Sequence, residues 1–435
     1  MAGANTFIGG ASGRLLAPSI VFRFFAAAVL FHLLAWLALL AAEPSLPDFS
    51  GGLGWTLAAL HLVTLGVLVM TTIGASLQLL PVATRQSVPS ARWPYELVWI
   101  LYTLGVVAVC TGMAIALPGM LWPGALAVGA ALLIYLVLLA GNLHGAKGTG
   151  LVVLHGWGAS LSLLVLLGSG LSLAAAYSGV IVLERQSALA LHVIFAGYGF
   201  MGLLVMGFSY ILVPMFALAD SPAPAWSRLS FGLAITALML ALLILSGLLP
   251  TVLFGASIAV AAVAFLIHVA LMDRSLRTGM RRELGTSFVL VRIGWGALAA
   301  SFGIALALEL EVNVNQGAVL FGVMLVGGLL TLLLGMLSRI VPFLAAMHAG
   351  AGMRRPPTPS AMTAQRALNI HLYSHTIALT LLLVGVFFGS SWLLLTGAAA
   401  GTLGAGAYAF FFVHAWRRMT QLLSKKGTPD RSEST

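Results

Sequence analysis

The chain has 435 residues, of which 60% are hydrophobic and 7% are charged, and its formal net charge at pH 7 is +10. Soluble domains contain about 25% charged residues, so this composition excludes a soluble globular protein. The mean hydropathy of +1.07 and the scattering of basic residues over short loops indicate a membrane protein and exclude a nucleic-acid partner.

A membrane-spanning helix needs about 20 apolar residues in a row. The first such run follows Arg14 and resembles a signal peptide. It is longer than the apolar core of such peptides, which has about 7–15 residues, so we expect it to remain as a helix. The single Cys110 lies inside the third run, which excludes a disulfide within the chain. Twelve spans are predicted, at 15–42, 52–81, 93–117, 119–143, 148–177, 188–218, 226–247, 250–272, 285–308, 316–347, 363–389 and 391–416.

The loops between these runs differ in charge. Lys and Arg collect on the cytoplasmic side of membrane proteins, so alternate basic loops predict cytoplasmic termini and an even number of spans in the inner (plasma) membrane. We expect one integral membrane domain at 1–424 and a disordered cytoplasmic tail at 425–435. The basic loops contain Arg14, Arg85, Arg92, Lys147, Arg228, Arg274, Arg277, Arg281, Arg282, Arg354, Arg355, Arg417, Arg418, Lys425 and Lys426, and the other loops contain Glu43, Asp48, Glu184, Arg185, Glu309 and Glu311.

Three of the predicted spans end in the same pattern, a Gly followed seven residues later by a Pro. The patterns lie at 74–81, 207–214 and 335–342, and they begin 133 and 128 residues apart. A long internal period indicates that one structural unit has been used several times. Twelve helices then divide into three units of four, at about 1–147, 148–283 and 284–424.

A second similarity supports this division. Residues 154–159 (LHGWGA) near the start of the second unit resemble residues 292–297 (RIGWGA) near the start of the third. Units with an even number of spans must run in the same direction. The predicted fold class is therefore an all-α polytopic membrane protein with twelve transmembrane helices in three parallel four-helix arcs around a pseudo-threefold axis.

Ionisable side chains inside a bilayer are expensive and usually functional. Carboxylates are almost absent from the predicted spans, whereas most of the ten histidines lie within them. Neutral imidazole is the usual axial ligand of haem iron and a common ligand of copper. The candidate ligands are His61, His155, His192 and the pair His371 and His375, which lie one helical turn apart. We assign bonding to neighbouring protein groups to His32, His144, His268, His348 and His414.

The helix number, the topology and the position of His61 in the outer part of the second span together resemble subunit I of the haem-copper oxidases and nitric-oxide reductases. In that superfamily the histidine of the second span is an axial ligand of a haem. The superfamily's paired histidines are absent from the interior of 316–347 and from 226–247, and no Tyr follows His192 by four residues. The resemblance therefore implies a diverged relative without the complete copper site.

Such a relative is similar to the NnrS family of haem-containing membrane proteins linked to nitric oxide stress. Residues 22–28 (FRFFAAA) are loosely like the start of that family. The His-Glu pair expected in the second span is replaced here by His61 and Leu62. The resemblance implies a role in nitric oxide or respiratory gas metabolism or in electron transfer, with a small gas or an electron donor as partner.

The leading hypothesis is a haem-binding membrane protein in which His61 supplies one axial ligand and His371 or His375 supplies the other. These three are also the metal-ligand candidates, with copper as the alternative metal. His192 and His155 are further ligand candidates, and Arg23, Arg292 and Arg339 are candidate partners of haem propionates. If the chain is an enzyme, we expect a haem-dependent oxidoreductase.

Two other functions fit the same residues. The histidines could line a transporter or channel for a metal ion or small solute, although the sixteen methionines are scattered rather than gathered at an entrance. Alternatively, the chain could be a non-catalytic assembly or sensor subunit that keeps the oxidase frame for packing alone.

Overall fold

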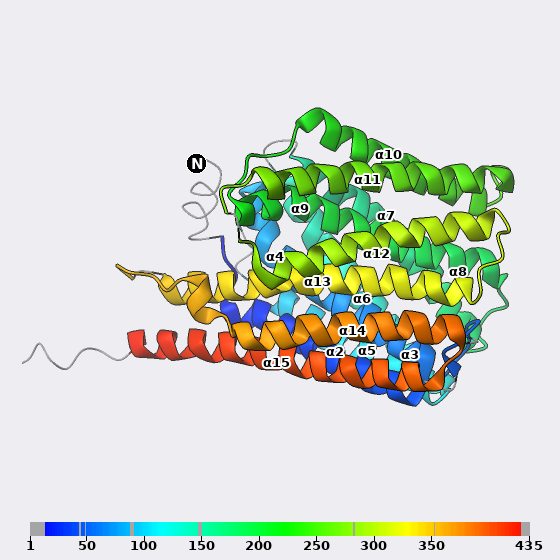
Figure 1. Cartoon of the computed structure of the whole chain (residues 1–435), viewed down its shortest axis with the longest axis horizontal. Coiled ribbons are helices and arrows are strands. Elements are labelled where there is room, and N and C mark those ends of the chain that lie inside the picture. Colours follow the sequence, from blue (N-terminus) through cyan, green and yellow to red (C-terminus); the bar gives the residue numbers. More distant parts are fainter. Residues whose placement is uncertain are drawn as a thin grey trace, which may run out of the picture.

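The computed structural model describes residues 14–42, 45–47, 49–87, 91–146, 150–281, 283–351 and 353–427. Within these ranges twelve helices are long and apolar enough to cross a membrane, which confirms the predicted number of spans. The helices lie side by side along one direction, and the start of α2 and the end of α15 lie at the same end of the bundle (Figure 1). The chain is thus a multi-pass membrane protein.

Ten of the spans contain one long helix, and the second and sixth are composed of three consecutive segments. Short 3₁₀ turns, η4 (Thr251–Leu253) and η5 (Pro359–Met362), precede two of the helices. The helices are α2 (Pro18–Ala42), α3 (Trp55–His61) with η2 (Leu62–Val69) and α4 (Met70–Thr84), α5 (Trp93–Ala114), α6 (Pro118–His144), α7 (Leu151–Tyr177), α8 (Arg185–Ile194) with η3 (Phe195–Gly202) and α9 (Leu203–Ala217), α10 (Pro224–Leu245), α11 (Phe254–Thr278), α12 (Gly285–Glu309), α13 (Gly317–Gly350), α14 (Gln365–Phe388) and α15 (Ser391–Gly427).

The ends of several helices follow from proline and from left-handed caps. Pro18, Pro118 and Pro224 each occupy the first helical position, where a missing N–H removes no hydrogen bond. α4 and α9 both end three residues after their motif proline, and the cap residues that follow, Arg85 and Leu218, adopt φ of 60° and 55°. The first two motifs therefore share a helix end, whereas α13 continues past its motif to Gly350.

The end of α15 differs from the predicted start of the tail. We expected residues 425–435 to be disordered, but α15 remains helical through Gly427, and residues 428–435 lie outside the described part. The loop residues Glu43, Asp48, Lys147 and Arg282 also lie outside it.

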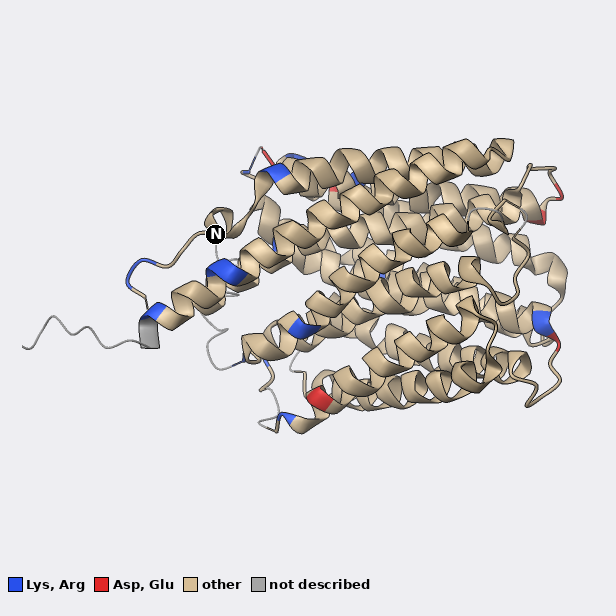
Figure 2. Cartoon of the chain, turned by 90° about the horizontal axis from the view of Figure 1, so that it is seen from below, with Lys and Arg blue, Asp and Glu red and all other residues tan. Residues whose placement is uncertain are grey.

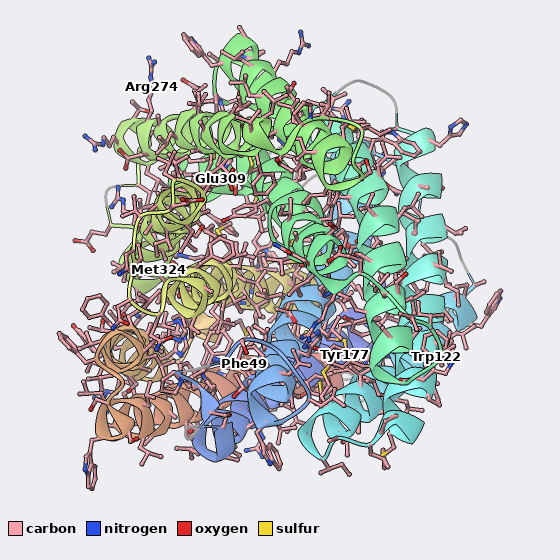
Figure 3. All side chains as sticks on the ribbon, turned by 90° about the vertical axis from the view of Figure 1, so that its right-hand side faces the viewer. Phe49, Trp122, Tyr177, Arg274, Glu309 and Met324 are labelled. Carbon is pink, nitrogen blue, oxygen red and sulfur yellow. The ribbon has the colours of Figure 1, made fainter. Side chains whose placement is uncertain are left out.

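The helices close into a ring. α6 packs against α7, α11 against α12, and α15 against α2, and Figure 3 shows this arrangement along the helix direction. The side chains of Phe22, Phe24 and Phe25 on α2 are fully buried, as expected of a helix held within the bundle. The three contacts coincide with the predicted unit boundaries, so they support the division into three units, which stays a prediction.

The motif glycines lie where two helices of one predicted unit cross closely. A Cβ atom on Gly74 would lie 2.7 Å from the Cβ of Phe24 on α2, and one on Gly207 would lie 2.6 Å from the Cβ of His155 on α7. A Cβ atom on Gly335 would lie 2.7 Å from the carbonyl oxygen of Ser287 on α12. In each case the partner is the first helix of the predicted unit. The glycine is therefore required by close backbone approach.

Charged side chains gather at the two ends of the bundle. Figure 2 shows most Lys and Arg residues at the end where α15 terminates, together with a few acidic ones. Glu184 and Arg185 lie where α8 begins, and Glu309 and Glu311 lie where α12 ends, in the connections α7–α8 and α12–α13. This charge distribution agrees with the pattern that predicted a cytoplasmic position for both termini.

Candidate functional site

His61 and His192 face each other from two different helices. His61 ends α3 and His192 lies in the last turn of α8. Their ring centroids are 6.3 Å apart and their planes differ by 24°. Both side chains are half-buried. The structure thus brings together a first-rank and a second-rank ligand candidate from two predicted units.

Hydrogen bonds define which nitrogen of His61 is free. Its Nδ1 lies 2.9 Å from the carbonyl oxygen of Leu57. Because a carbonyl can only accept, Nδ1 carries the proton and Nε2 keeps its lone pair. Metal-binding histidines commonly donate their other ring N–H in this way. Nδ1 of His192 is buried without a partner.

Each of these histidines is followed closely by a π-helical segment, η2 after His61 and η3 after the end of α8. Such segments are rare and often mark functional sites. Sequence reasoning missed them. The signal that the sequence offered was a glycine five residues after each histidine, at Gly66 and Gly197. Both glycines allow close packing, because a Cβ atom on Gly66 would lie 2.7 Å from Phe31 and one on Gly197 would lie 3.0 Å from Leu325.

A second cluster combines His371 and His375 of α14 with His32 of α2. Their ring centroids are 5.2 Å apart for His371 and His375, 5.9 Å for His32 and His371, and 6.3 Å for His32 and His375. All three rings are at most 1% exposed. Trp36 and Tyr408 pack against them. His32, which we had assigned to structural bonding, therefore belongs to the same cluster as two predicted ligands.

The protons of this cluster can be placed from its hydrogen bonds. His32 Nε2 accepts from the indole of Trp36 at 3.1 Å, so its Nδ1 carries hydrogen. His371 Nδ1 donates to the carbonyl of Gly404 at 3.0 Å. His375 Nε2 lies 2.9 Å from the hydroxyl of Thr331. Because that hydroxyl donates its hydrogen to the carbonyl of Gly327, His375 Nε2 donates to the Thr331 oxygen.

What remains unpaired is one donor and two acceptors. The donor is Nδ1–H of His32, and the acceptors are Nε2 of His371 and Nδ1 of His375. Each imidazole is neutral in this assignment. The two lone pairs on α14 are available as ligand atoms.

A third cluster contains His155, Tyr210 and His268 from α7, α9 and α11. The Tyr210 ring centroid lies 5.5 Å from that of His155 and 5.0 Å from that of His268. Nδ1 of His155 bonds to the carbonyl of Leu151 at 2.8 Å. The remaining nitrogen of His155, the Tyr210 hydroxyl and both nitrogens of His268 have no partner. His155 is thus linked through Tyr210 to His268, and no ring contact within the described residues joins it to another ligand candidate.

Histidine accounts for most of the unpaired polar atoms in the interior. Of the fourteen buried side-chain nitrogen and oxygen atoms without a partner in the described residues, eight are histidine nitrogens. Leaving a buried polar group unpaired costs about 1–3 kcal/mol. Histidine nitrogens are therefore the largest group of unpaired polar atoms in the described interior.

The described side chains do not form a ready-made metal site. No group of three or more His, Cys, Asp or Glu residues within the described ranges is arranged to hold a metal ion. Within the described residues, no ring contact joins His61 to His371 or His375. The predicted pairing of His61 with one of them on a single iron stays a prediction without a supporting contact.

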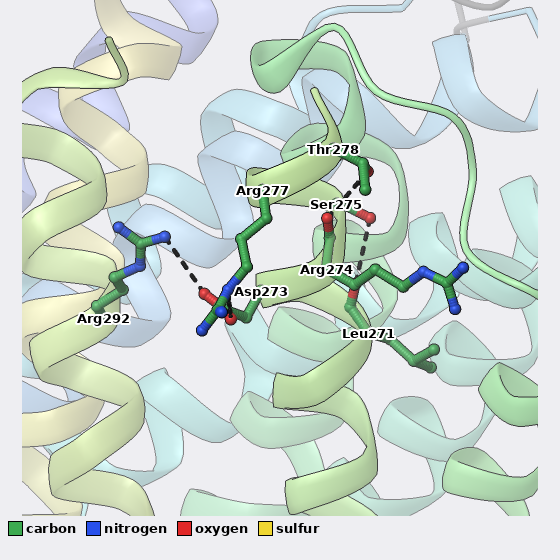
Figure 4. A network of polar contacts seen from close by, with 7 residues as sticks. All are labelled: Leu271, Asp273, Arg274, Ser275, Arg277, Thr278 and Arg292. Atoms are coloured by element: carbon green, nitrogen blue, oxygen red, sulfur yellow. Dashed lines mark hydrogen bonds and ion pairs between the residues drawn. The ribbon is translucent and has the colours of Figure 1, made fainter. Parts of the chain in front are cut away.

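The three arginines proposed as propionate partners each contact protein groups. Arg23 lies 3.6 Å from Glu96, and Arg292 lies 3.2 Å from Asp273, which also binds Arg277 at 2.5 Å (Figure 4). Arg339 donates to the Ser287 hydroxyl at 2.6 Å and to the carbonyl of Leu284. These contacts tie neighbouring helices together near the basic end of the bundle.

A capping carboxylate fixes the start of α8, the helix that carries His192. Glu184 accepts hydrogen bonds from the backbone N–H groups of Ser187 at 3.0 Å and Gln186 at 2.7 Å. These hydrogen bonds lower the pKa of the Glu184 carboxyl below its usual value, and the bond from Ser187 has the largest effect. Because the pKa is lower in the folded state, the ionised carboxylate stabilises the helix start at pH values above the usual glutamate pKa. This stabilisation is lost as the pH falls through the lowered pKa.

We therefore expect Glu184→Ala to speed amide hydrogen exchange at Gln186 and Ser187, since both amides lose their acceptor. Hydrogen exchange at neutral pH, read by mass spectrometry, measures this effect. Acidifying the parent protein should produce the same loss of protection. Equal exchange in parent and variant at neutral pH would show that the cap does not hold the helix start.

The comparisons with known proteins bear on the fold. No protein-family model matches the chain, and no curated protein matches it. A haem-copper terminal oxidase dimer solved by cryo-EM is similar to it over 97% of this chain and 86% of that chain, with a TM-score of 0.62 and 14% sequence identity. The chain therefore has a haem-copper oxidase-like fold, which confirms the predicted fold class.

Proposed function

We propose that the chain is a haem-binding protein of the inner (plasma) membrane, a diverged relative of the haem-copper oxidases without their full copper-ligand set. The observation that carries this proposal is His61. It lies on the second span of an oxidase-like fold, its Nδ1–H is bound by the carbonyl of Leu57, its Nε2 is free, and it faces His192. His61 is the first ligand candidate and His192 the nearest second one.

The donor atoms of the two half-buried rings fit haem iron, because both rings are imidazoles and neither is bonded to an acidic side chain within the described residues. The cluster of His32, His371 and His375 fits a porphyrin less well. Trp36 and Tyr408 cover its rings, and they would have to move to admit a flat macrocycle. His371 and His375 remain ligand candidates through their free lone pairs.

Bound haem would supply an iron centre for a small gas or for the passage of one electron. The residues of the chain would hold and orient it, with Leu57 fixing the His61 ring and the apolar helices excluding water. We propose nitric oxide or respiratory gas metabolism as the setting and the NnrS family as the nearest class, on the opening residues 22–28 and the missing copper ligands.

A pyridine haemochromogen spectrum of the purified, detergent-solubilised chain tests the proposal. We expect a Soret band in the intact protein and a haemochromogen signal that scales with protein concentration. Bound copper or zinc without haem would overturn the proposal in favour of a histidine-lined transporter. A protein with neither would favour the non-catalytic subunit.

A further inference from the structure

The three Gly–Pro motifs line one common apolar cavity between their helices. A cavity of about 50 Å³ lies between α4, α9 and α13, the helices that contain the motifs. Nine of its twelve lining residues occupy the same three positions in each of the three motifs. These positions lie two residues before, one residue after and five residues after the motif glycine. The cavity therefore lies where the three predicted units converge.

One of three matching side chains that line the cavity is small. Directly after the motif glycine stand Phe208 in the second motif and Met336 in the third, whereas the first has Ala75. All three line the cavity. A large side chain at residue 75 would therefore fill part of this space.

The lining offers water little to bind. Only two lining residues carry a hydroxyl, and both direct their hydrogen to protein acceptors. Thr72 donates to the sulfur of Met201 at 3.5 Å, and Ser209 donates to the carbonyl of Val205 at 2.7 Å. A buried water needs about 2–4 polar partners, and apolar cavities stay dry and accept apolar guests. The site therefore favours an apolar guest over water.

The volume limits the size of that guest. A dry cavity of about 150 Å³ accommodates benzene or xenon, and this one has about a third of that volume. A single atom or a diatomic molecule fits, whereas an aromatic ring does not.

We propose that this cavity is a binding site for one small apolar gas molecule of the class of dioxygen or nitric oxide. The use of such a site to hold gas near a haem rests on the proposed function. The binding itself follows from the cavity and does not require haem. Xenon is the probe, because it has the same apolar character and is located directly by its anomalous scattering.

Crystals of the full chain pressurised with xenon test the site. We expect one xenon peak between Ala75, Phe208 and Met336. Ala75→Met should reduce its occupancy at least tenfold by filling the space, whereas Met336→Ala should retain or increase it. The second variant guards against a folding defect in the first.

Two results would overturn the site: no xenon in the parent protein, or an equal peak in parent and Ala75→Met. Neither depends on pigment. A protein that binds xenon but lacks haem would refute the proposed function and keep the gas site, and a pigmented protein without xenon would do the reverse.

Discussion

Purified His61→Ala protein is expected to retain less haem per chain than the parent, with an affinity at least tenfold lower. The imidazole of His61 is the only one of the described ligand candidates with both a carbonyl-bound Nδ1–H and a place on the second span of the oxidase-like fold. Loss of a hydrogen-bond partner of a metal-binding histidine already costs about 10–100-fold in metal affinity. Removing the ligand itself should cost at least as much. Haem per chain is measured by pyridine haemochromogen against protein concentration.

His144→Ala provides the matched control. His144 ends α6 and is exposed, so its removal should leave the pigment unchanged. His192→Ala should produce an intermediate or equal loss, since its ring faces His61. If His61→Ala keeps the parent level while His371→Ala or His375→Ala loses it, the iron belongs to the cluster around His32 instead.

Gly335→Ala is expected to lower the free energy of unfolding by about 1–3 kcal/mol, the usual cost of overpacking a tight core. The added Cβ would lie 2.7 Å from the carbonyl oxygen of Ser287 and 3.0 Å from the Cβ of Leu290. Neither atom is the flexible end of a long side chain, so α12 and α13 would have to move apart. Denaturant titration in detergent, followed by circular dichroism, measures the change.

The same helix supplies the control for this variant. A Cβ atom on Gly322 would meet nothing within 4 Å, so Gly322→Ala adds the same methyl group to α13 without a clash. Equal stability of the two variants would refute the close crossing at Gly335. A loss confined to Gly335→Ala would support it.

The number and order of the spans were predictable because each is a long apolar run bounded by charged loops. The π-helical segments were not, because η2 and η3 continue the apolar pattern of their spans and change only the winding of the backbone. The length of α15 was underestimated for a different reason. Its basic end after Arg417 lowers the hydropathy without interrupting the helix.

The candidate residues were predictable individually, but their grouping was not. His371 and His375 share a helical face, which the spacing reveals. The approach of His32 to them, and of His61 to His192, depends on how distant helices pack. His32 was assigned to structural bonding because a single histidine in a span more often bonds a neighbouring protein group than a metal. Its bond to Trp36 and its unpaired Nδ1 follow only from the structure.

The contact between α2 and α15 has a consequence for how the protein is made. Phe22 lies against Phe412 and Trp416, with ring centroids 6.1 Å and 5.9 Å apart, yet these residues leave the ribosome nearly 400 positions apart. During biosynthesis this face of α2 must wait in lipid, or beside the insertion machinery, until the last helix arrives. A nascent chain stopped before Ser391 would therefore leave it without its native partner, open to quality-control proteases.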